Sequence, residues 1–342
     1  MSDDIFSQLF NLFNNDDDDV NWKLVEQISN HINKDSEEVL MLSNSSLNYE
    51  EIFRTIELSP EAISTEINTV QVLNPKDYGN WIINSIKHYD YSNLSMENNS
   101  FNLGAAQSSL VAMQLGNIVG FISKNTWGLS HFGFLLPRSK TLSLNNKNFQ
   151  NRISNFDIDE NQLVLALMTC EFVALELGKY TAPFSYVINQ MQLSNEALID
   201  ELKEASPNFD PTQITNPQDM FSNVPEINNL NFENIFDSMF APLSFYRSII
   251  KLRAKSILEF IDSSVVDLVM DLSFSSTENG LSEFESKLSK FDQQADEFIT
   301  FLEDTKNIHT TDDILSDESL IPNQSELQDP LSWAARTSLP PI

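Results

Sequence analysis

Side chains able to do chemistry are few in this 342-residue chain, and they are scattered. The histidines are His31, His88, His131 and His309. None of them has the short spacing that makes a metal site recognisable. The single cysteine, Cys170, stands beside Glu171. One cysteine excludes an intrachain disulfide and a multi-cysteine metal knuckle, and it favours a reducing compartment.

Other catalytic motifs are missing from the sequence. It has no serine nucleophile elbow, no Walker loop and no dinucleotide fingerprint, and its eight glycines leave little material for phosphate-binding loops. The region around Cys170 and Glu171 is therefore the part of the chain whose chemistry needs closest attention.

A helix must position that region. The apolar positions are Leu163, Ala166, Leu167, Cys170, Ala174 and Leu177, which recur at helical spacing and fall on one face. Acidic residues from Asp157 to Glu160 favour a helix start. The sequence predicts a helix over Asp159 to Leu177, with Leu163 to Leu177 continuous and largely buried.

Similar periodicity recurs along the rest of the chain. It predicts helices over Val20–Ile32, Tyr78–Ser85, Leu103–Ile122, Phe240–Leu272 and Leu281–Leu302. β-branched and alternating residues predict a short strand within Ile63–Leu73 and a half-buried edge strand at Thr141–Leu144. The fold class that follows is mainly α with a small β element (α+β).

The charge composition of the chain limits the kinds of molecule it is expected to bind. The chain has 50 acidic against 20 basic residues, a net charge of −30, which repels nucleic acid and anionic lipid surfaces. Leu103–Ile122 is largely apolar, but polar residues such as Gln107 and Gln114 interrupt it. We therefore expect no nucleic-acid binding and no membrane insertion, and we read its glycines as close-packing positions.

The sequence divides into three parts. Residues 1–19 hold an amphipathic helix, Ile5 to Phe13, and an acidic linker, Asp16 to Asp19. Residues 20–309 form the main domain, with a Pro- and Asn-rich loop at 206–229. Residues 310–342 are a C-terminal tail expected to pack on or near that domain. Because the acidic N-terminus resembles no export signal, we expect a cytoplasmic protein.

Several separated segments carry a family resemblance. They are Val20-Asn21-Trp22-Lys23-Leu24, Met113 to Gly120, Leu136-Pro137-Arg138, and Leu320-Ile321-Pro322 followed by Leu327 to Leu331. In this order they resemble the actinobacterial zincin-like metallopeptidase family, whose members are described as hydrolases, over roughly Val20 to Leu331. The resemblance implies a zincin-like helical domain with short edge strands, and zinc as the family's cofactor.

The resemblance also locates the motif. In zincins a helix presents His-Glu-x-x-His, whose histidines hold zinc while the glutamate activates the metal-bound water. This chain reads Cys170-Glu171-Phe172-Val173-Ala174 at that place. Glu171 keeps the general-base position, but Cys170 and Ala174 replace both ligands. We therefore expect an inactive motif, no metal and no cofactor.

Three hypotheses follow. The first is a pseudopeptidase that binds a protein or peptide, with Thr141–Leu144 as a docking strand. The alternative is a metal-dependent hydrolase or peptidase with a rearranged metal site, using Cys170, Glu171 or Glu176 with a distant histidine or acidic ligand. The third is an assembly protein that docks through Ile5 to Phe13.

Overall fold

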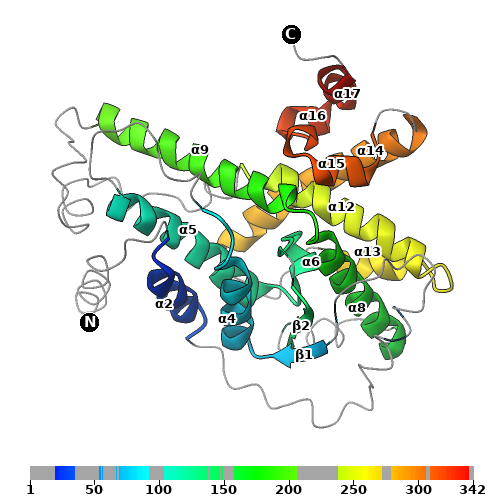
Figure 1. Ribbon diagram of the computed structural model, residues 1–342. Helices are drawn as coiled ribbons and strands as arrows, with labels where there is room; N and C mark the ends of the chain where they lie inside the picture. The colour runs from blue at the N-terminus through cyan, green and yellow to red at the C-terminus, as the bar shows by residue number, and fades with distance from the viewer. Residues whose placement is uncertain are drawn as a thin grey trace.

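The computed structural model describes residues 20–34, 54, 56, 67, 69–91, 104–137, 139–146, 148, 158–205, 238–271, 279–305 and 309–338. This part of the chain is mostly helical with one two-stranded parallel sheet, which confirms the predicted fold class. Figure 1 shows α2, α4 and α5 on one side of the molecule and α12, α13 and α14 on the other. The N-terminal helix and linker at 1–19 and the loop at 206–229 lie outside the described residues.

Three helices form the N-terminal side: α2 (Trp22–Ile32), α4 (Pro75–Ile86) and α5 (Gly104–Asn125). Helix α2 packs against α5 at two glycines. A Cβ on Gly116 would lie 2.8 Å from the Cβ of Ile28, and one on Gly120 would lie 2.4 Å from Cδ1 of Ile32. The glycines therefore allow close helix packing, as predicted. Within the described ranges, no helix is long and apolar enough to cross a membrane.

The sheet pairs β1 (Thr69–Leu73) with β2 (Thr141–Asn145), with Thr69 opposite Thr141. Both strands lie where the sequence predicted strands. The prediction of a half-buried edge strand at Thr141–Leu144 was wrong in one respect, because β2 is buried from Leu142 onward. The polar residue Ser143 on that stretch pairs across the sheet, since Gln71 Nε2 donates to Ser143 Oγ over 2.7 Å. That hydrogen bond lets the alternating polar residue be buried.

Helix α8 (Glu160–Leu177) is the predicted motif helix. It begins at Asp159, whose side chain accepts the N–H of Gln162. Every residue from Leu163 to Leu177 except Leu165 is buried, so the predicted continuous buried helix is confirmed. Burial on all sides, not on one face, marks α8 as a core helix. A short helix that the sequence did not predict, α6 (Leu129–Phe132), packs beside it and ends at Gly133, which has a φ of 78°.

The second half contains α9 (Ala182–Ala205), α12 (Phe240–Ile257), α13 (Ser264–Met270) and α14 (Asn279–Thr305). The sequence predicted one continuous helix over Phe240–Leu272, and that prediction was wrong. The chain turns after α12, and Asp262 Oδ1 accepts the N–H of Ser264 where α13 begins. A side-chain acceptor of this kind starts a new helix and breaks the pattern, although the apolar spacing continues across the turn.

The C-terminal tail is helical: α15 (Thr311–Ser316), the 3₁₀ turn η4 (Glu318–Leu320), α16 (Gln324–Gln328) and α17 (Pro330–Ser338). Capping boxes at Thr310 and Asn323 start α15 and α16. Trp333 is fully buried and its Nε1 donates to the carbonyl of Leu320 over 2.7 Å. Helix α16 contacts α12 and α14, so residues 310–338 pack on the rest of the described structure.

Candidate functional site

The motif positions lie near the middle of the molecule, where α8 contacts α6, β2, α12 and α13. Cys170 and Ala174 are one helical turn apart and therefore share a face of α8. Both are completely buried, and so is Glu171. The structure thus brings the three sequence-predicted residues into one buried stretch of helix.

Glu171 is bound to the first turn of α6. Its Oε1 accepts the N–H of Leu129 over 3.0 Å. Its Oε2 accepts the N–H of Ser130 over 3.0 Å and the hydroxyl of Ser130 over 2.9 Å. A Cβ on Gly128 would lie only 2.5 Å from Oε2, so a larger residue there would displace the carboxylate. Glu171 therefore caps α6 from a different part of the chain.

Two opposing effects set the ionisation of Glu171. Burial raises the pKa of its carboxyl to about 7, while the hydrogen bonds from Ser130 and Leu129 act in the opposite direction. Nearby, burial and then the charge of Glu171 raise the pKa of the Tyr78 hydroxyl. Tyr78 therefore stays protonated near neutral pH, whereas the raised pKa of Glu171 lies close to it.

Cys170 is a poor metal ligand in this setting. Burial, and then the charge of Glu171, raise the pKa of its thiol, and the charge of Arg247 only partly opposes this. The ligand form of cysteine is the thiolate, which such a site disfavours. Ala174 has no donor atom. Among the described residues, no group of three or more His, Cys, Asp and Glu side chains is arranged to hold a metal ion.

The histidines are as dispersed as the sequence suggested. His31 and His88 are exposed. His309 packs edge-on against Trp333 at a centroid distance of 5.8 Å. His131 is buried in α6, where its Nε2 lies 3.1 Å from the carbonyl oxygen of Asp271.

A buried arginine joins several helices at this place. Arg247 of α12 is fully buried and donates to the carbonyls of His131 in α6 and Met270 in α13. Its Nε also lies 3.2 Å and 3.1 Å from the two carboxylate oxygens of Asp292 in α14. Sequence reasoning missed this group, because one arginine in an apolar helix does not reveal a partner 45 residues away.

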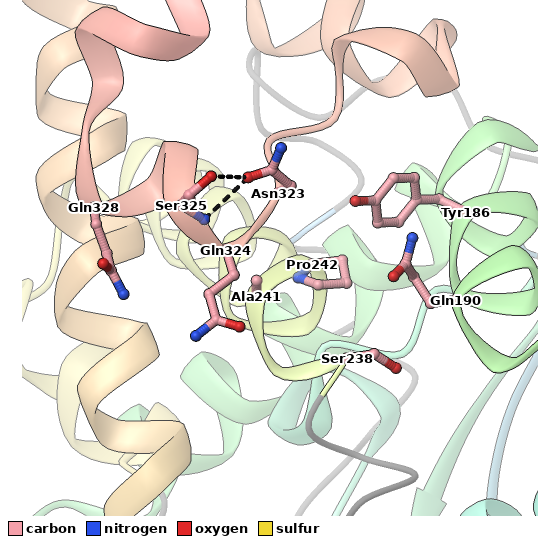
Figure 2. Close-up of a pocket in the computed structure, with 9 residues that line it drawn as sticks. All are labelled: Tyr186, Gln190, Ser238, Ala241, Pro242, Asn323, Gln324, Ser325 and Gln328. Carbon is pink, nitrogen blue, oxygen red and sulfur yellow. Dashed lines mark hydrogen bonds between the residues drawn. The ribbon is translucent and has the colours of Figure 1, made fainter. Parts of the chain in front are cut away.

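A pocket of about 440 Å³ lies between α9, the start of α12 and α16. Figure 2 shows Tyr186 and Gln190 of α9 facing the residues around α16 across this space. None of the nine lining residues is charged. Sequence reasoning missed the pocket too, because its walls come from three distant segments and carry no motif.

Comparisons with known proteins give one structural neighbour to report. No protein-family model matches the chain, and no curated protein matches it. A crystal structure from Chloroflexus aurantiacus, described as a "putative hydrolase with a novel fold", has 15% sequence identity and a TM-score of 0.49, and covers 94% of this chain and 100% of its own. A likeness at that level assigns no activity to this chain.

Proposed function

We propose that this protein is a zincin-like scaffold that has lost zinc hydrolysis and serves to bind a protein or peptide. The observation that carries the proposal is the position of the Glu171 carboxylate, which accepts three hydrogen bonds from α6. A general base in a zinc peptidase must face a metal-bound water. Glu171 faces backbone and hydroxyl donors, which gives it a structural role.

The ligand positions support the same proposal. Catalytic zinc normally takes three protein ligands and keeps one open position. Ala174 supplies no ligand, and the buried, protonated thiol of Cys170 favours none. A scaffold with these residues keeps its helices and its surface, and the helix that carries the motif positions, α8, contributes buried side chains to the hydrophobic core.

Binding through β2 has less support than the sequence suggested. The side chains of β2 from Leu142 to Asn145 are buried, whereas those of β1 are partly or fully exposed. Strand addition by a peptide would therefore have to use β1. The binding surface is better sought on the helical part of the molecule.

Metal analysis combined with peptide assays tests the proposal. Protein purified from zinc-supplemented cells should contain well below one equivalent of zinc. Peptides that bind should be recovered uncleaved by mass spectrometry, with or without a chelator. One equivalent of tightly bound zinc, or cleavage that a chelator abolishes, would overturn the proposal and favour the metal-dependent hydrolase. The double variant Cys170→His/Ala174→His then tests whether ligands at these two positions restore metal binding.

A further inference from the structure

The pocket between α9, α12 and α16 has a lining suited to one class of ligand. We propose that it binds a short, uncharged stretch of peptide main chain from a partner protein, with an apolar side chain seated on its floor. We call it the amide pocket, defined by Tyr186, Gln190, Ser238, Pro242, Gln324 and Gln328. This proposal rests on the proposed peptide-binding function and names its site.

Side-chain amides dominate the walls. Gln190 projects from α9, while Gln324 and Gln328 come from α16 on the opposite side. Within the described structure, none of these three amides has a hydrogen-bond partner in the protein. A glutamine amide both donates and accepts hydrogen bonds, as a peptide group does. The walls can therefore pair with the N–H and C=O groups of a bound main chain.

A pocket lined without charged side chains is unusual on this chain, whose net charge is −30. Two carboxylates act on the pocket residue Tyr186, and both are engaged, because Glu326 accepts from Arg336 Nε at 2.5 Å and Glu318 Oε1 accepts from Asn189 Nδ2. Asn323 Oδ1 is also engaged, since it accepts from the N–H and the hydroxyl of Ser325 (Figure 2). It also accepts the N–H of Glu326, and these bonds start α16. A charged ligand would lose hydration here, and Arg336, the cation that acts on Tyr186, is already paired with Glu326, so the lining favours neutral groups.

Apolar residues line the pocket at the start of α12, and an exposed leucine follows one of the lining residues on α9. Ala241 and Pro242 are buried residues that line the pocket at the start of α12. On α9, Leu193 follows Gln190 by three residues and is 57% exposed. Residues three apart are neighbours on a helix surface. A ligand held by Gln190 can therefore place one apolar side chain on Pro242 and another against Leu193.

The side chain of Tyr186 bears on whether the ligand is a peptide or a carbohydrate. Tyr186 directs its hydroxyl across the pocket in Figure 2. A sugar ring would gain most from a ring face to stack on, whereas a peptide group uses the hydroxyl as donor and acceptor. The volume of about 440 Å³ matches a ligand of drug-like size, which corresponds to a few residues.

The experiment uses the full chain and the blocked peptide acetyl-Gln-Leu-Gln-amide, measured by calorimetric titration. A second form with photoleucine at the central position locates the site by cross-linking. We expect cross-links within residues 186–193, 238–242 and 323–328. The charged peptide acetyl-Glu-Leu-Glu-amide should bind at least tenfold more weakly, because its carboxylates lose hydration and Arg336 is already paired with Glu326.

Substitutions in the walls complete the test. The double variant Gln190→Leu/Gln324→Leu should weaken binding by roughly tenfold, since it removes hydrogen bonds and leaves shape and charge almost unchanged. Gln293→Leu is the matched control, because Gln293 is an exposed helical glutamine of α14 outside the pocket. It should bind within about twofold of wild type. Equal unfolding midpoints for the three proteins show that the fold is retained.

The possible results separate the two proposals. If the peptide binds but cross-links elsewhere and the wall variants bind normally, the amide pocket is not the site, while the peptide-binding function stands. If maltotriose binds in the pocket and the peptide does not, the ligand class is wrong. If no peptide binds anywhere, both the site and the peptide-binding part of the proposed function are overturned.

Discussion

Ser130 gives Glu171 two hydrogen bonds, one from its N–H over 3.0 Å and one from its hydroxyl over 2.9 Å, and both reach the same carboxylate oxygen. The two residues are 41 positions apart in sequence. This contact turns the carboxylate at the motif position toward the positive end of α6. Together with the N–H of Leu129, it gives hydrogen-bond partners to both oxygens of a carboxyl group that is fully buried in the core.

Replacing that carboxylate should cost stability. Glu171→Ala leaves the N–H groups of Leu129 and Ser130 buried without an acceptor, at a cost of roughly 3 kcal/mol or more in the free energy of unfolding. Glu160→Ala is the control, because Glu160 is exposed in the first turn of the same helix. It should cost less than about 1 kcal/mol. Equal losses in chemical denaturation would refute the capping role.

The raised pKa of Glu171 predicts a pH dependence with a definite sign. Its carboxyl ionises near pH 4.5 when unfolded but near 7 when folded, because burial disfavours the charge. As the pH rises from 4.5 to 7, the unfolded state loses this proton first, and the contribution of the group to stability falls. The loss is on the order of 3 kcal/mol, since each pKa unit corresponds to about 1.4 kcal/mol.

Glu171→Gln isolates this effect, because glutamine resembles the protonated carboxyl and does not titrate. The unfolding free energy of wild type minus that of the variant should decrease between pH 4.5 and 7 and then level off. A difference that stays level from pH 4.5 to 7 and falls only as the pH drops below 4.5 would mean that the hydrogen bonds from α6 outweigh burial and lower the pKa.

The motif helix could be predicted because its signal is local. Apolar spacing from Leu163 to Leu177 and the acidic start at Asp159 are contained in one stretch of sequence, and α8 follows them. The same reasoning failed at residues 258–263, where the apolar spacing continues while the chain turns. The side-chain signal for the new helix is the hydrogen bond from the N–H of Ser264 to Asp262, and a single Asp does not distinguish a turn from an exposed helical position.

The candidate site was only partly accessible from sequence. The positions of Cys170, Glu171 and Ala174 on one helix were predicted, but the partner of Glu171 was not, because α6 is a single turn without a periodic pattern. The amide pocket gave no sequence signal either. Its walls come from residues near 190, 240 and 325, and their common property of neutrality appears only when the fold brings them together.

The single thiol offers a direct probe of the core. Burial raises the pKa of Cys170, so a thiol reagent such as iodoacetamide should modify folded protein only as fast as the protein unfolds. Unfolded protein should incorporate one label per chain, since Cys170 is the only cysteine. A Ser325→Cys variant gives an exposed reference thiol. Rapid labelling of Cys170 in folded wild type would instead indicate an accessible thiolate and would support the rearranged metal site.

Among the basic residues, Arg247 should contribute most to the free energy of unfolding. Its guanidinium joins α12 to α6, α13 and α14 through the carbonyls of His131 and Met270 and the carboxylate of Asp292. Lysine would keep the charge but could not reproduce this planar set of donors. Arg247→Lys should therefore lower the free energy of unfolding by roughly 3 kcal/mol or more, because Asp292 and the two carbonyls lose partners.

The control for Arg247 lies on the same helix. Arg253 pairs with Asp312 at the surface, where Asp312 is 52% exposed, so Arg253→Lys should change stability by less than about 1 kcal/mol. A double-mutant cycle of Arg247→Lys with Asp292→Asn should give a coupling energy of at least about 1 kcal/mol, because the two side chains contact each other directly. A coupling energy near zero would show that the carbonyl contacts alone hold the guanidinium of Arg247. Similar losses of stability for Arg247→Lys and Arg253→Lys would contradict the role of Arg247 as the cation that connects these four helices.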